Sequence, residues 1–318
     1  MQNKIAVLGA GTMGPGIAVS YLLGGYEVFL YSRRESTLEQ ARKIIGESLS
    51  LFVEEAMISS SQAEDAGKRL QLTTDLARAV ADAWYIAETI VENPEAKTAL
   101  YQQLDALLPE DVIIASNTSY LDIFSLMPKA RLPYTVISHW YAPAHILPLV
   151  EVVKGDDTLP SVMERTTELH KKCGKQPVQM QKFIPGFIVN RMQSAMSREV
   201  SYLIENGYCT AQQLDLAVKT SLMPRGLLLG LVQRLDFNGL DMVAHSMRNK
   251  SYSPAPVTPQ PKYILDPVER GEYGIKSGKG LYDYTHMPME EVLRIRDKQL
   301  LRSVRLGEEF LHQPLHRE

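Results

Sequence analysis

The residues best suited to proton transfer are His139 and Glu151. His139 follows a short apolar stretch, and Glu151 lies inside the apolar residues 149–153. An imidazole exchanges protons near neutral pH, and a neighbouring carboxylate fixes its tautomer and stabilises the imidazolium. The two residues are therefore a candidate acid/base pair. His145 and His170 are rivals without a comparable carboxylate, and a histidine near a strand end is more often structural.

A glycine motif near the start predicts a dinucleotide site. It reads Gly9-Ala10-Gly11-Thr12-Met13-Gly14 and follows the apolar residues 5–8. Gly9 permits a tight turn, and Gly11 lets the backbone approach a pyrophosphate. Gly14 allows close packing of helix on strand, and the helix N-terminus favours the anion. We expect Gly9, Gly11, Thr12, Met13 and Gly14 to bind the cofactor.

The residues after the second predicted strand bear on the choice between NAD and NADP. An acidic residue usually stands there to bind the ribose 2′-hydroxyl, but this sequence has Ser32-Arg33-Arg34. An arginine can pair with a 2′-phosphate, and the missing carboxylate removes a repulsion. The site therefore favours NADP, with Ser32, Arg33 and Arg34 as contacts. The alternative is that both arginines are solvated loop charges.

Short polar side chains follow another predicted strand, at Ser116-Asn117-Thr118-Ser119. At a strand end they can bind a nicotinamide amide, for which Asn117 is the candidate, or a substrate oxygen. A simple turn or helix cap explains the same residues equally well.

The elements that must position these residues alternate along the first part of the chain. Strand-like and helical stretches form a strand–helix–strand unit over residues 5–31, and a helical excursion follows at 36–67. More strands are expected at the following residues: 84–87, 112–115, 135–138 and 149–153. Beyond Pro185 the pattern is helical, at 189–206, 211–221 and 227–247. This predicts an α/β fold, a Rossmann-type doubly wound sheet followed by a mostly helical C-terminal domain.

Length and composition limit the remaining possibilities. A chain of 318 residues suits two domains, and 45% hydrophobic with 22% charged residues is a globular mix. The net charge of −3 argues against a nucleic-acid partner. Two cysteines, Cys173 and Cys209, are too few for a disulfide framework or a thiolate metal site. With no apolar run long enough to span a bilayer, we expect a cytoplasmic protein without metal or membrane partner.

The motifs taken in order resemble the 3-hydroxyacyl-CoA dehydrogenase family, whose superfamily includes carnitine dehydrogenase and gulonate 3-dehydrogenase (lambda-crystallin). The resemblance covers roughly residues 3–285. It rests on these segments: GAGTMGPGIA, ETIVENPEAK, SNTSYL, HWYAPAHILPLVEVV, PGFIVNRM, DFNGLD and GEYGIKSGKGLYDY. It implies a Rossmann domain at 1–182 and a helical substrate and dimerisation domain at 183–285. Residues 286–318, a helical extension, lie beyond it and have no assigned role.

The resemblance also implies residue roles. His139 would be the catalytic base and Glu151 its partner. Glu92 and Lys97 match positions that line the cofactor site, while Ser119 and Asn190 match positions that contact the substrate. The chain would form a homodimer through its helical domain, which would close one side of the active site.

Three departures from the family pattern concern the substrate. Ala142-Pro143 stands where relatives have Asn-Pro, which removes a polar contact. The centre of the excursion, at residues 51–55, reads Leu-Phe-Val-Glu-Glu and suits coenzyme A poorly. Arg225 resembles an arginine of the gulonate-type relatives and can pair with a free carboxylate, although a structural charge at a helix end is an equal alternative.

The leading hypothesis is an NAD(P)-dependent enzyme that interconverts a 3-hydroxyacyl-CoA and its 3-oxoacyl-CoA, as in fatty acid metabolism. The alternative substrate is a small free 3-hydroxy acid. A non-catalytic dinucleotide-binding protein is a further reading, but it would need neither His139 nor Glu151. A β-hydroxyacid dehydrogenase with a catalytic lysine shares the glycine motif but lacks the histidine–glutamate pair.

Overall fold

The computed structural model describes the whole chain except residues 1–2, 250–252, 258–259, 313–314 and 316–318. The chain divides into two compact units, Met1–Asn190 and Arg191–Glu318. The expected junction at residue 182 lies shortly before this division, and the expected C-terminal extension belongs to the second unit. Each unit is considered by itself.

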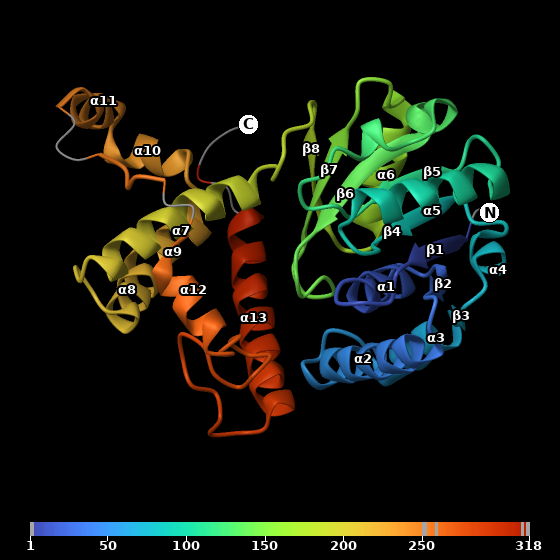
Figure 1. The fold of residues 1–318 in the computed structure, drawn as a ribbon, viewed down its shortest axis with the longest axis horizontal. Helices are drawn as coiled ribbons and strands as arrows, with labels where there is room; N and C mark the ends of the chain where they lie inside the picture. The colour runs from blue at the N-terminus through green and yellow to red at the C-terminus, as the bar shows by residue number, and fades with distance from the viewer. Residues whose placement is uncertain (1–2, 250–252, 258–259, 313–314, 316–318) are drawn as a thin grey trace. The chain divides into compact units, whose positions relative to one another are not determined.

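The first unit is built on one eight-stranded sheet with the order β3-β2-β1-β4-β5-β6-β7-β8 (Figure 1). Every neighbouring pair is parallel except β6 and β7, which are antiparallel. The strands are β1 (Lys4–Leu8), β2 (Glu27–Tyr31), β3 (Leu70–Thr73), β4 (Tyr85–Glu88), β5 (Ile113–Ser116), β6 (Thr135–Trp140), β7 (Leu149–Lys154) and β8 (Gln176–Met180).

Helices cover both faces of this sheet, as expected for a doubly wound fold. They are α1 (Gly14–Leu23), α2 (Glu35–Glu54), α3 (Ser60–Lys68), α4 (Leu76–Val80), α5 (Pro94–Leu107) and α6 (Pro160–Lys172). Side chains of α4 and α5 join a core cluster with residues of β1, β4, β5, β6 and β7. On the other face, Tyr21 of α1 and His170 of α6 both pack against Tyr85. The Rossmann-type prediction is confirmed.

The expected excursion at 36–67 is the helix pair α2–α3. Its second helix begins with a capping box, in which Ser59 and Gln62 satisfy each other's backbone N–H groups. Two strands, β3 and β8, had no counterpart among the predicted strands. Both lie at the edges of the sheet, and their residues are mostly half-exposed or exposed. An edge strand needs no continuous apolar run, so its sequence signal is weak.

The regular secondary structure of the second unit is helical over its described residues, apart from short bridges near residues 274–283. Its elements are α7 (Val189–Glu205), which begins at the end of the first unit, and α8 (Ala211–Ala217), η3 (Val218–Leu222), α9 (Met223–Leu229), α10 (Gln233–Asn238), α11 (Leu240–Asn249), α12 (Lys262–Glu269) and α13 (Met289–Leu311).

The stretch 227–247 is three helices rather than the single one expected. Gly230 and Gly239 end α9 and α10 with φ of +65° and +84°, which interrupts helical hydrogen bonding. The helix α13 covers most of the C-terminal extension and packs against α9, where Gly307 lies close to Leu227. Within the described parts of the chain, no helix is both long and apolar enough to cross a membrane.

Candidate active site

His139 and Glu151 face each other across the only antiparallel strand pair of the described sheet. They are register partners on β6 and β7, so their side chains leave the same face of the sheet. His139 Nδ1 lies 2.9 Å from Glu151 Oε2, and both residues are buried. The structure thus brings together the two residues that the sequence proposed as an acid/base pair.

Four donors surround the Glu151 carboxylate. Besides His139, the Tyr141 hydroxyl donates to Oε2 at 2.7 Å, and the N–H groups of Ile188 and Val189 donate to Oε1 at 2.9 and 3.1 Å. Burial raises the pKa of Glu151, but these hydrogen bonds outweigh burial and leave the pKa below its usual range. An ionised carboxylate only accepts hydrogen bonds. His139 therefore donates through Nδ1–H, which leaves Nε2 to exchange a proton.

Aromatic rings hold the His139 imidazole in place. Its centroid is 4.5 Å from that of Tyr141 and 5.0 Å from that of Phe187. Phe187 is 1% exposed and has a φ of +50°, an unusual backbone conformation for a bulky residue. Phe187 and Ile188 therefore help to build the site, although sequence analysis noted them only as part of the PGFIVNRM motif.

The two rival histidines lie in other surroundings. His145 packs against Phe52. His170 is fully buried, and its Nε2 lies 3.1 Å from Ser138 Oγ. Burial, reinforced by the Lys175 charge, lowers the pKa of His170 to about 3. A histidine that stays neutral throughout the physiological range is a structural core residue.

The glycine motif forms the turn between β1 and α1. Gly9 has a φ of +116°, and its N–H donates to the Tyr31 carbonyl at 2.9 Å. A Cβ on Gly9 would lie 2.5 Å from the Thr89 carbonyl oxygen, and one on Gly14 would clash with the Gly9 carbonyl. A Cβ on Gly11, by contrast, would meet no atom within 4 Å. Gly9 and Gly14 are thus required by packing, while Gly11 leaves space for a ligand.

A cavity of about 420 Å³ opens beside this turn. It brings Gly9 and Gly11 together with Ser32, Arg33 and Arg34, which follow β2. Its other lining residues are mostly apolar: Ala10, Tyr31, Thr37, Leu76, Thr89, Ile90, Val91, Ala96, Ala99, Leu100 and Gln103. Apolar walls suit a flat base, and the arginines suit a phosphate, so the residues present fit a dinucleotide.

A buried charge network lies at the ends of β4 and β5. Glu88 is 0% exposed and accepts from Lys97 Nζ at 2.7 and 2.8 Å and from the Tyr101 hydroxyl at 2.8 Å. The Ser116 hydroxyl and the Ile90 N–H complete its shell. Sequence analysis named Lys97 but not Glu88; an ionisable residue closing the otherwise apolar run Tyr-Ile-Ala-Glu was the available signal. Lys97 is itself 0% exposed.

The other predicted polar residues are connected to this network. Glu92 lies 3.5 Å from Lys97 Nζ and accepts from Thr118 Oγ1 at 2.6 Å and Ser119 N–H at 2.7 Å. Asn117 Oδ1 accepts from the Trp140 N–H at 2.8 Å. The segments after β4 and β5 are thereby linked to each other and to the strand that carries His139.

The last two predicted residues differ in placement. Asn190 is the second residue of α7 and directly follows Val189, whose N–H binds Glu151. Arg225 belongs to the second unit, on α9, where its guanidinium donates to the Ser221 carbonyl and hydroxyl at 3.1 Å each. Ala142 and Pro143, where the sequence departs from the family pattern, are joined by a cis peptide bond.

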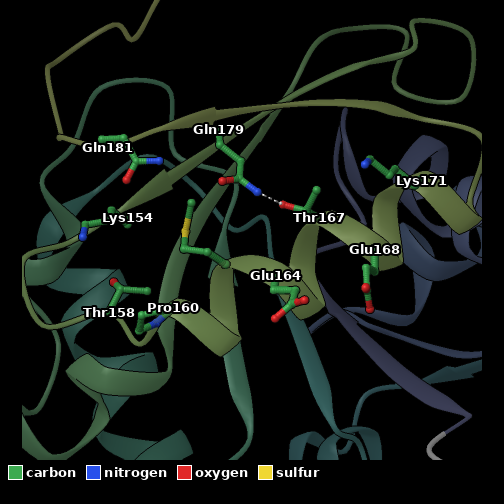
Figure 2. A pocket seen from close by; sticks show the side chains of 10 residues that line it. Lys154, Thr158, Pro160, Glu164, Thr167, Glu168, Lys171, Gln179 and Gln181 are labelled. Carbon is green, nitrogen blue, oxygen red and sulfur yellow. Dashed lines mark hydrogen bonds between the residues drawn. The ribbon is translucent and has the colours of Figure 1, made fainter.

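A second hollow, of about 400 Å³, lies along α6 and β8 and contains none of the predicted site residues (Figure 2). Lys154 and Lys171 line it together with Glu164 and Glu168, and Gln179 Nε2 donates to Thr167 Oγ1 at 2.9 Å. Charges of both signs give it no uniform field for an anionic cofactor. Among the residues that the structure describes, no group of three potential ligands could hold a metal ion.

Comparison with known protein families accounts for most of the chain. The model of the 3-hydroxyacyl-CoA dehydrogenase NAD binding domain matches residues 4–183, and that of the C-terminal domain of the same enzymes matches residues 186–284.

Individual relatives cover nearly the full length. The chain is 32% identical over 289 residues to 5-formyl-3-hydroxy-2-methylpyridine 4-carboxylate 5-dehydrogenase of Mesorhizobium japonicum, covering 90% of this chain and 92% of the relative. It is 30% identical to a probable 3-hydroxybutyryl-CoA dehydrogenase of Deinococcus radiodurans, covering 88% and 100%. A solved structure of the pyridine carboxylate enzyme, described as an NAD+ dependent dismutase, superposes with a TM-score of 0.85 at 30% identity and covers 97% of this chain and 99% of that one.

Proposed function

The chain belongs to the 3-hydroxyacyl-CoA dehydrogenase family of oxidoreductases, and on this basis we propose that it oxidises a hydroxyl-bearing carbon with His139 as general base and Glu151 as its partner. The observation that carries the proposal is the 2.9 Å contact between His139 Nδ1 and the Glu151 carboxylate. That carboxylate is ionised and accepts hydrogen bonds from four donors. That contact leaves Nε2 as the proton acceptor.

In the direction of oxidation, His139 Nε2 takes the proton of the substrate hydroxyl, and Glu151 stabilises the imidazolium that forms. Bound NAD(P) supplies the hydride acceptor, and its phosphates would lie at the Gly9–Gly14 turn. In reduction, the imidazolium returns the proton to the carbonyl oxygen. Ser119 and Asn190 hold the substrate oxygen, and Glu92 orients Ser119 through the hydrogen bond to its N–H.

For the cofactor, we propose a preference for NADP. Ser32, Arg33 and Arg34 line the same cavity as the glycine turn, so a 2′-phosphate would meet two guanidinium groups and no carboxylate from this segment. Steady-state kinetics with both cofactors test this directly. A kcat/KM that is much higher with NAD than with NADP would contradict the proposal. The solved relative, by contrast with this proposal, is described as NAD+ dependent.

For the substrate, we propose a small free hydroxy acid in preference to a coenzyme A thioester. The pyridine carboxylate dehydrogenase matches this chain over 97% of its length in structure, which takes in α13 beyond the family domains. The exposed Arg225 guanidinium is oriented by Ser221 and has no ion-pair partner among the described residues. A fixed planar cation of this kind suits a carboxylate.

A 3-hydroxyacyl-CoA is the second candidate, supported by the names of relatives such as the Deinococcus protein. Turnover of acetoacetyl-CoA compared with a panel of free 3-hydroxy acids separates the two. We expect higher kcat/KM with a free acid, and Arg225→Met should raise its KM while leaving acetoacetyl-CoA unaffected. Cofactor binding without turnover of any compound would instead favour a non-catalytic protein.

We further propose that the protein is a homodimer joined through the second unit. That unit exposes many large apolar side chains, including Val232 (79%), Met247 (67%) and Phe237 (61%). Extensive exposed apolar surface is typical of a protein interface. Sedimentation equilibrium at micromolar concentration should give twice the chain mass of 35.7 kDa; a monomer would contradict the proposal.

A further inference from the structure

We propose that Tyr141 is a positioning residue of the acid/base pair: through the Glu151 oxygen that it shares with His139, it sets the pH range in which His139 exchanges a proton. This inference rests on the proposed function of His139 and Glu151. Sequence analysis offered no reason to select Tyr141, because only the structure shows that its hydroxyl binds Glu151.

Tyr141 and His139 compete for one atom. Tyr141 Oη lies 2.7 Å and His139 Nδ1 lies 2.9 Å from Glu151 Oε2. The two residues are separated by Trp140, and alternate residues of an extended chain point to the same side. Their rings accordingly meet edge to face, with centroids 4.5 Å apart at 64°.

The other carboxylate oxygen of Glu151 is already occupied by backbone donors, so neither Tyr141 nor His139 can use it instead. Oε1 accepts from the N–H groups of Ile188 and Val189, which lie at the beginning of α7. A carboxylate has about four lone-pair directions, and each is matched here by a donor. Glu151 therefore cannot turn toward His139 without losing backbone hydrogen bonds.

The groups that contact His139 are few. Among the described residues, Glu151 of β7 and Tyr141 are the titratable groups that hydrogen-bond to its ring or pack on it, and Phe187, from the segment before α7, is apolar. Burial, followed by the Glu151 carboxylate, raises the pKa of Tyr141, while a backbone hydrogen bond with Asn190 acts in the opposite direction. The raised pKa keeps the Tyr141 hydroxyl protonated, so that it can donate to Glu151.

A donor on Glu151 reduces the negative charge available to His139. Removing the Tyr141 hydroxyl should leave Oε2 to His139 alone and so stabilise the imidazolium. The imidazolium of the Tyr141→Phe variant should then lose its proton at a higher pH than that of the wild type. Oxidation needs neutral His139, so its acid limb should move upward by the same amount, as should the alkaline limb of reduction.

The ring titration can be followed by NMR of protein labelled with ¹³C-histidine, with His139→Ala identifying the signal. This readout needs no substrate. We expect Tyr141→Phe to raise the midpoint, whereas Tyr26→Phe, which removes a hydroxyl just before β2, four strands away from β6, should leave it unchanged. In a Glu151→Gln background, Tyr141→Phe should produce no further shift, because the charge it modulates is gone. Tyr141→Leu serves the same measurement if Tyr141→Phe does not fold.

An unchanged or lowered midpoint in folded Tyr141→Phe would overturn the inference and show that Tyr141 only packs against the pair. The proposed function can fail separately. If His139→Ala retained full turnover, the acid/base role itself would be wrong, and the positioning role with it, whatever the titration showed.

Discussion

His139 on β6 stands opposite Glu151 on β7 in an antiparallel register, and this single pairing converts two separate residues into a 2.9 Å hydrogen-bonded couple. Every other neighbouring pair in the sheet is parallel. The reversal of β7 relative to β6 therefore places the carboxylate and the imidazole side by side at the sheet, where the start of α7 can also reach the carboxylate.

Replacing His139 with alanine should abolish most turnover while cofactor affinity stays unchanged. Positioned proton transfer contributes about 10²–10⁴-fold to the rate, so kcat should decrease by a factor in that range. Steady-state kinetics and fluorescence titration with the reduced cofactor separate the two effects. An unchanged kcat would refute the assignment of the base.

Two glycines of the nucleotide turn should respond differently to alanine. Gly11→Ala adds a methyl group to open space that the cofactor is expected to occupy, so affinity should drop at least tenfold with the melting temperature unchanged. Gly14→Ala forces a Cβ against the Gly9 carbonyl, so the protein itself should be destabilised. Thermal unfolding without cofactor, alongside cofactor titration, checks both. Equal melting losses in the two variants would contradict the distinction.

Ser32→Asp should move the preference toward NAD. The new carboxylate can bind a ribose 2′-hydroxyl and repels a 2′-phosphate, so the ratio of kcat/KM for NADP to that for NAD should fall by at least tenfold. Arg33→Ala combined with Arg34→Ala should lower the ratio by weakening NADP alone. If both variants kept the wild-type ratio, these residues would be solvated loop charges instead.

Lys97→Met should strongly destabilise the first unit, because it leaves the buried Glu88 carboxylate without its counter-ion. Breaking one side of a buried ion pair typically costs about 3–5 kcal/mol. Lys68→Met is the matched control, since the ion pair of Lys68 with Glu64 is exposed on α3. Urea-induced unfolding gives the comparison, and similar midpoints for both variants would argue against a role of the network in stability.

His170 should make the protein less stable in mild acid. Its pKa is about 3 in the folded chain and about 6.5 when unfolded, so between these values only the unfolded state takes up the proton. Stability from this residue is complete above pH 6.5 and decreases as the pH falls toward 3, by roughly 2–3 kcal/mol by pH 4.5. The free energy of unfolding of His170→Gln should vary less steeply than that of the wild type over this window. Parallel pH profiles would show that other groups cause the acid sensitivity.

Local patterns in the sequence determined the elements and the chemistry they carry. The Gly9–Gly14 motif between an apolar run and a helical stretch indicated the nucleotide turn, because glycine at these positions satisfies a short-range steric need. The positions of His139 and Glu151 in apolar stretches placed them on strands. These signals depend on neighbouring residues and are readable without a fold.

Strand register, network partners and helix interruptions were decided only by the tertiary structure. Eight residues, 141–148, separate β6 from β7, so no tight turn fixed the alignment of His139 with Glu151. Glu88 and Tyr141 acquired roles only when distant segments supplied Lys97 and Glu151 as partners. Such contacts join residues nine to twelve positions apart on different elements, and their free energy depends on burial and geometry that sequence spacing does not reveal.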